Sequence, residues 1–329
     1  ECHARGIKVI VDVVLNHLGP VFYYDVNGNG ELDDGELAPA FDSSGIDGAV
    51  VMRDDISPAG FADPAWYHRR GEITNYDDPE QSLLGDFEGG LRDLDTSRED
   101  VRQALLAVTL SWLERVEFDG IRFDAAKHVE ESFFPWFLAE LRASRPGLIA
   151  IAEAFDGDVG RLADFTDARG FDSVLDFAAK YQVFEEVFVS GAPTTAFRDL
   201  HVAQQAAFRD TEHTDGAGVA PVEIPFRFLD HHDVPRFLSL VDDARALKAA
   251  LAYLLTMDGV PTLYYGTEQG FAGAVDPDNR EALWTSAYAT DGDLFVWLRR
   301  LVELRKQQRA LRRGDLRFVW TSDRREAGN

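Results

Sequence analysis

Three acidic residues stand at the ends of short apolar runs, where a parallel sheet would present catalytic groups. Asp124 closes the run 119–124, Glu153 closes the run 148–153, and Asp233 follows the run 226–231. Barrel enzymes carry their chemistry at the C-terminal ends of their parallel strands. Two carboxyl groups about 5 to 5.5 Å apart can cleave a glycosidic bond with retention, one as nucleophile and one as acid. Neighbouring strands can provide that separation.

Basic residues accompany these acids. Arg122 lies two positions before Asp124, and His232 lies directly before Asp233. Because strand residues two apart share a face, the Arg122 guanidinium would point the same way as the Asp124 carboxylate and keep it ionised. A lone acid at a strand end is more often a helix N-cap or a surface residue. Three such acids with these partners favour catalysis.

A separate pattern of oxygen ligands occupies residues 25–36 (DVNGNGELDDGE), which match the twelve-residue EF-hand loop. Its glycine at the sixth position allows the turn. Flanking helices are not evident, so the pattern predicts an isolated calcium loop; a solvated acidic loop is the alternative. Calcium at the weak end of such affinities is filled mainly outside the cell, which favours a secreted or periplasmic protein. The predicted ligands are Asp25, Asn27, Asn29, the Glu31 carbonyl, Asp33 and Glu36.

These acids need elements that bring strand ends together. Residues 7–15 (IKVIVDVVL) are β-branched and almost continuously apolar, as expected for a parallel strand buried on both faces. Similar runs recur at 119–124, 148–153, 171–177, 226–231 and 260–265. Helical patterns occur at 98–116, 131–144, 178–190, 193–209, 242–257 and 293–311. The alternation predicts an α/β fold with a parallel sheet, closed or doubly wound.

The interval between the first two strands is too long for one βα unit, which needs about 30 residues. Residues 19–90 are rich in Gly, Asp, Pro and aromatic residues, and we interpret them as an inserted, loop-rich domain. Residues 1–18 and 91–312 then form the main domain. After a break at 312–315, the strand-like run 316–320 predicts that 313–329 begin a further β domain, cut short.

Bulk composition excludes some function classes. Lys and Arg total 33 against 58 for Asp and Glu, giving a net charge of −25 that opposes a phosphate backbone, so nucleic acid is not an expected partner. The sequence contains no apolar run long enough to span a membrane. Cys2 is the single cysteine, which excludes an internal disulfide and a cysteine metal cluster. Residues 1–8 resemble a last helical turn capped by Gly6, without an initiator Met or a signal peptide.

Several blocks resemble conserved segments of glycoside hydrolase family thirteen, the α-amylase family, and they occur in the family's order. They are 12–17 (DVVLNH), 90–95 (GLRDLD), 120–128 (GIRFDAAKH), 152–154 (AEA), 228–233 (FLDHHD) and 264–268 (YYGTE). Several blocks at compatible spacings are far more specific than one short motif. The resemblance implies a (β/α)8 TIM barrel, incomplete at its N-terminus, with domain B inserted after strand three. The likeness is greatest to bacterial α-amylases.

The resemblance also implies roles for the acids. Asp124 matches the nucleophile, Glu153 the general acid/base, and Asp233 the residue that stabilises the distorted sugar and its transition state. Other matching positions contact the sugar or the catalytic carboxylates. They are His17, Arg122 and His232, with Lys127 on the leaving-group side.

The same likeness implies a calcium ion between domain B and the barrel. Asn16 and Asp93 match positions whose side chains bind that ion, and His128 matches one that gives a backbone carbonyl. The alternative is that Asn16 and Asp93 cap their own turns.

Three functions stay open. The first is an α-amylase acting on starch or related α-1,4-glucans, favoured by Lys127 and His128. The second is a cyclodextrin-forming or other transglycosylase, which resembles this chain at 266–269 and 276–280. The third is a non-catalytic glucan-binding relative, which would be expected to lack one of the three acids. An α-glucan is the expected partner, and a monomer is expected.

Overall fold

The computed structural model describes residues 1–324, which divide into two compact units. The first unit comprises Glu1–Ala154 with Ala168–Phe171 and Thr214–Gly218, and the second contains the remaining residues. Among residues 1–324 no helix combines the length and the apolar character needed to cross a bilayer.

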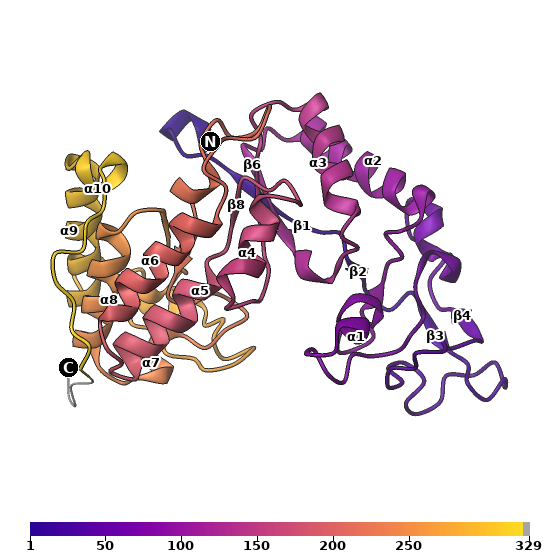
Figure 1. Cartoon of the computed structure of the whole chain (residues 1–329). Helices are drawn as coiled ribbons and strands as arrows, with labels where there is room; N and C mark the ends of the chain where they lie inside the picture. The colour runs from indigo at the N-terminus through magenta and orange to yellow at the C-terminus, as the bar shows by residue number, and fades with distance from the viewer. Residues whose placement is uncertain (325–329) are drawn as a thin grey trace. The chain divides into compact units, whose positions relative to one another are not determined.

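The first unit is built on a parallel sheet. β1 (Ile10–Val14) pairs with β6 (Gly120–Asp124), which pairs with β7 (Ile149–Ala152). Gly120 allows this close pairing, because a Cβ there would lie 2.2 Å from the Ile149 side chain. Helices α2 (Glu99–Arg115) and α3 (Phe133–Ser144) run beside each other next to this sheet (Figure 1). The core is aromatic: Phe123 on β6 packs against Phe134, Phe137 and Phe171.

The burial predicted for the first strand is wrong. β1 alternates between exposed and half-buried residues, with Ile10 40% and Val14 45% exposed. Within the described residues, β1 is the end strand of its sheet and pairs only with β6. The alternation shows that one face of the strand, which carries Ile10 and Val14, is not covered. Gly6 does close a single turn, η1 (His3–Arg5), and adopts the left-handed conformation expected of a cap, with φ 70°.

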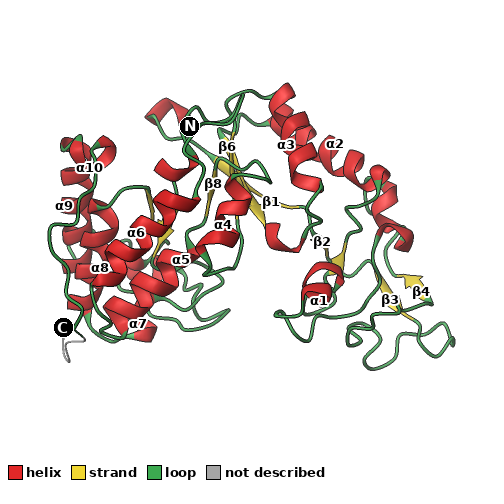
Figure 2. Cartoon of the chain, in the orientation of Figure 1, coloured by secondary structure: helices red, strands yellow, loops and turns green. Residues whose placement is uncertain are grey.

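Residues 19–90 are mostly loop, as their composition predicts (Figure 2). Arg92 anchors this region: it is fully buried, pairs with Asp86 and donates to the Phe22 and Leu37 carbonyls. The only α-helix in the segment, α1, begins after Asp78, which accepts the N–H groups of Glu80 and Gln81. The elements here and at its edges are β2 (His17–Leu18), β3 (Phe22–Tyr24), β4 (Ala49–Val51), η2 (Ala59–Ala62), η3 (Pro64–Trp66), α1 (Pro79–Leu84) and β5 (Arg92–Asp93).

The second unit is mainly helical, with one short parallel pair. β9 (Phe226–Phe228) pairs with β10 (Val260–Thr262), and Leu175 bridges to Phe226. Helix α8 packs against α9 and η5. The other elements are α4 (Val159–Thr166), β8 (Ser173–Val174), α5 (Phe177–Ala179), η5 (Lys180–Val189), α6 (Thr195–Ala207), η6 (Pro221–Glu223), α7 (Phe237–Leu240), α8 (Ala244–Thr256), η7 (Thr267–Gln269), η8 (Leu283–Ser286), α9 (Asp293–Gln307) and α10 (Ala310–Arg313).

Most predicted elements are present within a few residues, with four differences. The run 178–190 is mainly π-helix, η5, and the run 293–311 divides into α9 and α10. Helix α4 was not predicted, although Asp158 is an N-cap signal that could have marked it. The predicted strand at 316–320 is irregular, because no strand among the described residues pairs with it. Ser322, which follows this run, contacts the start of α6: the Thr195 N–H donates to the Ser322 carbonyl, and the Ser322 N–H donates to the Thr194 hydroxyl oxygen.

Candidate active site

Arg122 holds the two acids of the first unit. Its Nη1 lies 2.6 Å from Asp124 Oδ1 and 2.6 Å from Asp12 Oδ1, and its Nη2 pairs with Glu153 Oε1. β1, β6 and β7 bring these groups together, because Asp12 is in register with Arg122 and Glu153 directly follows β7. Burial works against charge on the guanidinium, but the surrounding carboxylates outweigh it and raise the pKa of Arg122. Arg122 is therefore a permanent cation between the predicted nucleophile and the predicted acid.

The residue after the nucleophile has an unusual backbone. Ala125 adopts φ 49°, a left-handed conformation that costs energy for a residue with a Cβ. In this conformation its N–H lies 3.3 Å from Glu153 Oε2, and the next N–H, of Ala126, donates to the Glu153 carbonyl. Glu153 is 3% exposed. The turn after β6 therefore positions the buried glutamate beside the aspartate.

Two buried or half-buried imidazoles, of His17 and His128, also lie in the first unit. Burial lowers the pKa of His17, against the opposing charges of Asp124 and Asp86, and burial lowers that of His128 to about 4. Phe87 packs against both rings, 5.0 Å from His17 and 4.7 Å from His128 between ring centroids. Lys127 is half-buried on η4 (Ala126–His128), which directly follows Ala125. The predicted substrate residues His17 and Lys127 thus share the first unit with Asp124.

Asp233 and His232 lie in the second unit, where they form their own cluster. His232 Nε2 lies 2.8 Å from Asp233 Oδ2, and Arg280 Nη2 lies 3.1 Å from Asp233 Oδ1. Partial burial works against ionisation of Asp233, but the hydrogen bond and charge of His232 outweigh it and lower the pKa. Phe155 and Phe177 pack against neighbouring His231. Arg280 was not predicted as a site residue, although it is the last residue of the segment 276–280, which resembles transglycosylases.

The three residues predicted to bind calcium beside the barrel meet at one point. Asn16 Nδ2 lies 2.7 Å from Asp93 Oδ1 and 2.8 Å from the His128 carbonyl oxygen. Asn16 and Asp93 are buried. Two oxygens therefore face the Asn16 amide nitrogen, while Asn16 Oδ1 lies 3.1 Å from His17 Nδ1. Turning this amide over would bring a third oxygen to the same point, and such a donor set suits calcium.

The predicted calcium loop also closes on itself. Asn27 and Asn29 each place Nδ2 2.7 Å from Asp33 Oδ2, and Asp25 accepts the N–H groups of Asn29 and Gly30. Glu36 is buried and accepts the N–H groups of Val26 and Asp33. The backbone N–H of Glu31 donates to Asn29 Oδ1. Strand β3, not a helix, precedes the loop.

His68 is a site residue that the sequence analysis missed. Its Nδ1 lies 2.5 Å from Asp93 Oδ2, and its Nε2 lies 3.1 Å from Glu130 Oε1 and 3.4 Å from Asp95 Oδ1. Burial lowers its basicity, but the hydrogen bonds to these three carboxylates prevail and raise the pKa of His68 to about 12. Burial also raises the pKa of Asp93, which the charge of His68 opposes. No local pattern around His68 marks it, since its partners are 25 or more residues away.

An α/β chain in which one arginine joins an aspartate and a glutamate at adjacent parallel strand ends has the groups that a glycoside hydrolase requires. The family model described as "Alpha amylase, catalytic domain" matches residues 1–285. The chain therefore belongs to the α-amylase family.

Individual relatives agree with this family. α-Amylase 2 of Schwanniomyces occidentalis is 30% identical over 310 residues, covering 93% of this chain and 52% of the relative. The crystal structure of an Anoxybacillus α-amylase has a TM-score of 0.76 at 26% identity, covering 98% of this chain and 61% of that one. A cyclomaltodextrin glucanotransferase with three domains has a TM-score of 0.75 at 26% identity, with the same coverage. The chain therefore spans little more than half the length of these relatives.

Proposed function

We propose that this chain is the catalytic part of a retaining hydrolase that cleaves α-1,4-glucosidic bonds of starch or related α-glucans. The observation that carries the proposal is the Arg122 guanidinium, which contacts Asp124 and Glu153 through its two terminal nitrogens. Two carboxylates that share one guanidinium are compatible with the separation of about 5 to 5.5 Å that retention needs.

The proposed reaction has two steps. Asp124 attacks the anomeric carbon while Glu153 gives its proton to the leaving glycosidic oxygen, so the enzyme holds a glycosyl ester and the first product departs. Glu153, now a carboxylate, takes a proton from water, and that water displaces Asp124. Arg122 keeps Asp124 ionised for the first step. Asp233 would stabilise the positive charge that develops on the sugar ring.

The proposed fold is a (β/α)8 barrel in which 1–18 and 91–312 form the barrel domain and 19–90 form domain B. His17, Lys127 and His232 would contact the sugar. We propose an extracellular or periplasmic monomer.

Calcium is the proposed cofactor, at two places. Asn16, Asp93 and the His128 carbonyl would hold one ion between domain B and the barrel, supported by their convergence. The loop 25–36 would hold a second ion, supported by its closed ring of side chains. In both places a cation would replace hydrogen bonds that amide nitrogens now make. The ion's chemistry is structural: it would fix loops around the site.

Transglycosylation is the second candidate, favoured by the similarity to a cyclomaltodextrin glucanotransferase. Both activities use the same covalent intermediate, and they differ in whether water or a sugar hydroxyl attacks it. Incubating the whole protein with starch and with maltoheptaose separates them. A hydrolase yields short linear products, whereas a transglycosylase yields cyclic or lengthened ones.

The mechanism is tested through the anomer of the first product and through Asp124. Proton NMR during hydrolysis should show the α-anomer first, and Asp124→Asn should lower kcat by several orders of magnitude while starch binding stays largely intact. The control is Asp199→Asn on α6, an exposed aspartate paired only with its neighbour Arg198. A β-anomer as first product, or near-normal turnover by Asp124→Asn, would overturn the mechanism.

A further inference from the structure

His68 is the centre of a buried charge cluster outside the catalytic pair. We define the His68 cluster as His68, Asp93, Asp95 and Glu130. Both ring nitrogens face carboxylate oxygens: Nδ1 faces Asp93 alone, and Nε2 faces Asp95 and Glu130. Nδ1 is therefore placed to donate a hydrogen bond to Asp93, and Nε2 is placed to donate to Asp95 and Glu130.

The backbone holds His68 beside the segment that it contacts. The His68 N–H donates to the Asp93 carbonyl at 3.2 Å, and the Asp95 N–H donates to the Trp66 carbonyl at 2.8 Å. Tyr67 forms an antiparallel bridge with Leu94. The backbone contacts between residues 66–68 and 93–95 therefore fix the position of the imidazole beside the carboxylates.

The cluster gives the two Asp93 oxygens different tasks. Oδ2 is held by His68 at 2.5 Å, which leaves Oδ1 directed at Asn16 Nδ2 at 2.7 Å. Asn16 Nδ2 also contacts the His128 carbonyl. Without the His68 bond, the carboxylate could rotate about its Cβ–Cγ bond and turn Oδ1 away from this point. Carboxylates that bind metals are commonly oriented by such outer partners.

The cluster also links the segments around this point. Glu130 follows η4, the turn that ends at His128, and its other oxygen accepts the Thr96 hydroxyl. His68 lies in the insertion, Asp93 at the insertion's end, and Glu130 beyond β6. The His68 imidazole thus connects the segment that contains Asp93 with the segment that contains His128, and these supply two of the three proposed calcium ligands.

An alternative use of the same atoms is a metal site at His68, Asp95 and Glu130, whose ligand atoms lie within 4.8 Å of one another. A metal there would need a bare Nε2. Such an ion would displace only the Nε2 proton, and the Nδ1 contact with Asp93 would be unchanged.

We propose that His68 is a positioning residue that orients Asp93 for calcium through its Nδ1–H. This inference rests on the proposed calcium site of Asn16, Asp93 and His128. It assigns no role in bond cleavage to His68.

Two substitutions separate the two ring nitrogens. The amide nitrogen of His68→Asn can occupy the place of Nδ1 and keep the bond to Asp93, whereas that of His68→Gln reaches the place of Nε2 and loses it. Both remove the charge, so a general loss of packing or charge would affect them alike. Both are made in the whole protein in a Glu36→Gln background, which weakens the loop 25–36, and calcium binding is measured by calorimetry with chelator competition.

The expected result is a Kd for calcium raised about 10- to 100-fold by His68→Gln and by no more than about threefold by His68→Asn. Melting temperatures in excess chelator should fall for both variants, which reports the shared loss of charge. Equal calcium affinity in the His68→Gln variant and the background protein would overturn the inference, as would equal weakening by both substitutions.

A further control distinguishes failure of this inference from failure of the proposed calcium site or of the proposed glycosidase activity. Asp93→Asn in the same background should abolish most of the remaining calcium binding. If it does not, the calcium site is wrong and the role of His68 falls with it. Starch hydrolysis by the same preparations would still show whether the proposed glycosidase activity stands.

Discussion

Arg122 is the residue on which the candidate site depends most. It contacts Asp12, Asp124 and Glu153 with two nitrogens, a task that suits the flat, rigid fork of a guanidinium. A lysine has one compact charge on a flexible stem and cannot span three carboxylates in the same way. The identity of the cation at this position therefore matters as much as its charge.

We expect Arg122→Lys to lower kcat on the order of 10²-fold, because a displacement of about 1 Å between catalytic groups has such an effect. Initial rates on maltoheptaose measure it. Arg98→Lys is the control, since Arg98 forms only an exposed pair with Asp100. Unchanged turnover in Arg122→Lys would mean that the guanidinium does not orient the acids.

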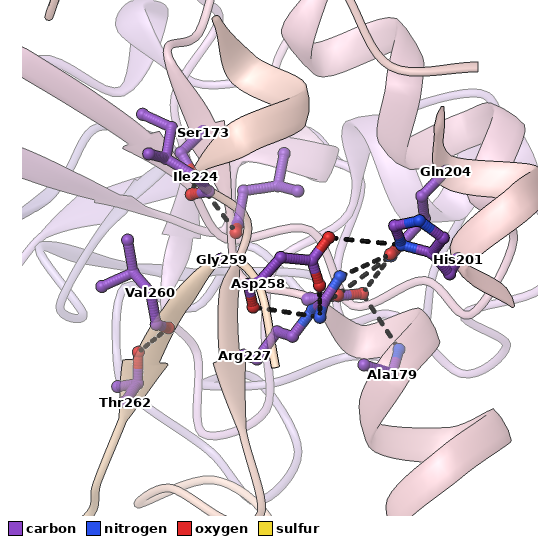
Figure 3. Close-up of polar contacts among 12 residues, drawn as sticks. Ser173, Ala179, His201, Gln204, Ile224, Arg227, Asp258, Gly259, Val260 and Thr262 are labelled. Carbon is purple, nitrogen blue, oxygen red and sulfur yellow. Dashed lines mark hydrogen bonds and ion pairs between the residues drawn. The ribbon is translucent and has the colours of Figure 1, made fainter. Parts of the chain in front are cut away.

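At the scale of elements, a polar network supports β9 and the segment before β10. Arg227 on β9 pairs with Asp258 and donates to Gln204 on α6, while His201 lies 3.2 Å from Asp258 (Figure 3). Arg227 also pairs with Asp176, the N-cap of α5. Burial works against charge on Asp258, but His201 and Arg227 outweigh it and lower its pKa to about 2. This network holds the strand that leads toward Asp233.

The lowered pKa of Asp258 makes a prediction about stability and pH. Because the folded pKa lies below the unfolded value, the stabilisation is present above about pH 4 and is lost as the pH falls through about 2. Asp258→Asn should lower the free energy of unfolding by about 2 kcal/mol at pH 7. Urea unfolding of both proteins at pH 7 and near pH 2.5 measures the difference, which should shrink at the lower pH.

A suitable control for Asp258 is Asp243, the N-cap of α8, whose pKa is lowered to about 2 by an exposed pair with Arg245. Asparagine also caps helices, so Asp243→Asn should change stability little. A gap between wild type and Asp258→Asn that is as large near pH 2.5 as at pH 7 would contradict the linkage.

At the scale of the whole molecule, calcium is the expected source of stability for a chain with long loops. A ligand that binds only the folded state at about 100 times its Kd adds about 2.7 kcal/mol to the free energy of unfolding. Chelator should therefore lower the melting temperature of the whole protein. Glu36→Gln should lose only part of this effect, because Asn16 and Asp93 are untouched.

The two calcium sites can be separated by calorimetry. Glu36→Gln should remove the contribution of the loop 25–36, while Asp93→Asn should remove that of the other site. If Glu36→Gln titrates like wild type beside an Asp93→Asn control that loses binding, the acidic loop is solvated surface and holds no metal.

The sequence alone determined the features that arise from local pattern. The period of apolar residues predicts most helices and strands. The blocks around Asp124, Glu153 and Asp233 predict the family, because each block is contained in a few consecutive residues. The same reasoning predicted a strand at 316–320 and full burial of β1. Both failed because a strand and its burial depend on partners that the pattern of one segment does not contain.

The way in which distant charged groups pair became known only from the folded chain. Arg122 meets Asp12 and Glu153, and His68 meets Asp93 and Glu130, across separations of 25 to 110 residues. The family resemblance marked Arg122 as a partner of the catalytic carboxylates, whereas the contacts of His68 have no signature in the sequence around it. Their charge states and the orientation of the Asp93 oxygens follow from burial and from the partner's position in space, and these exist only once the chain has folded.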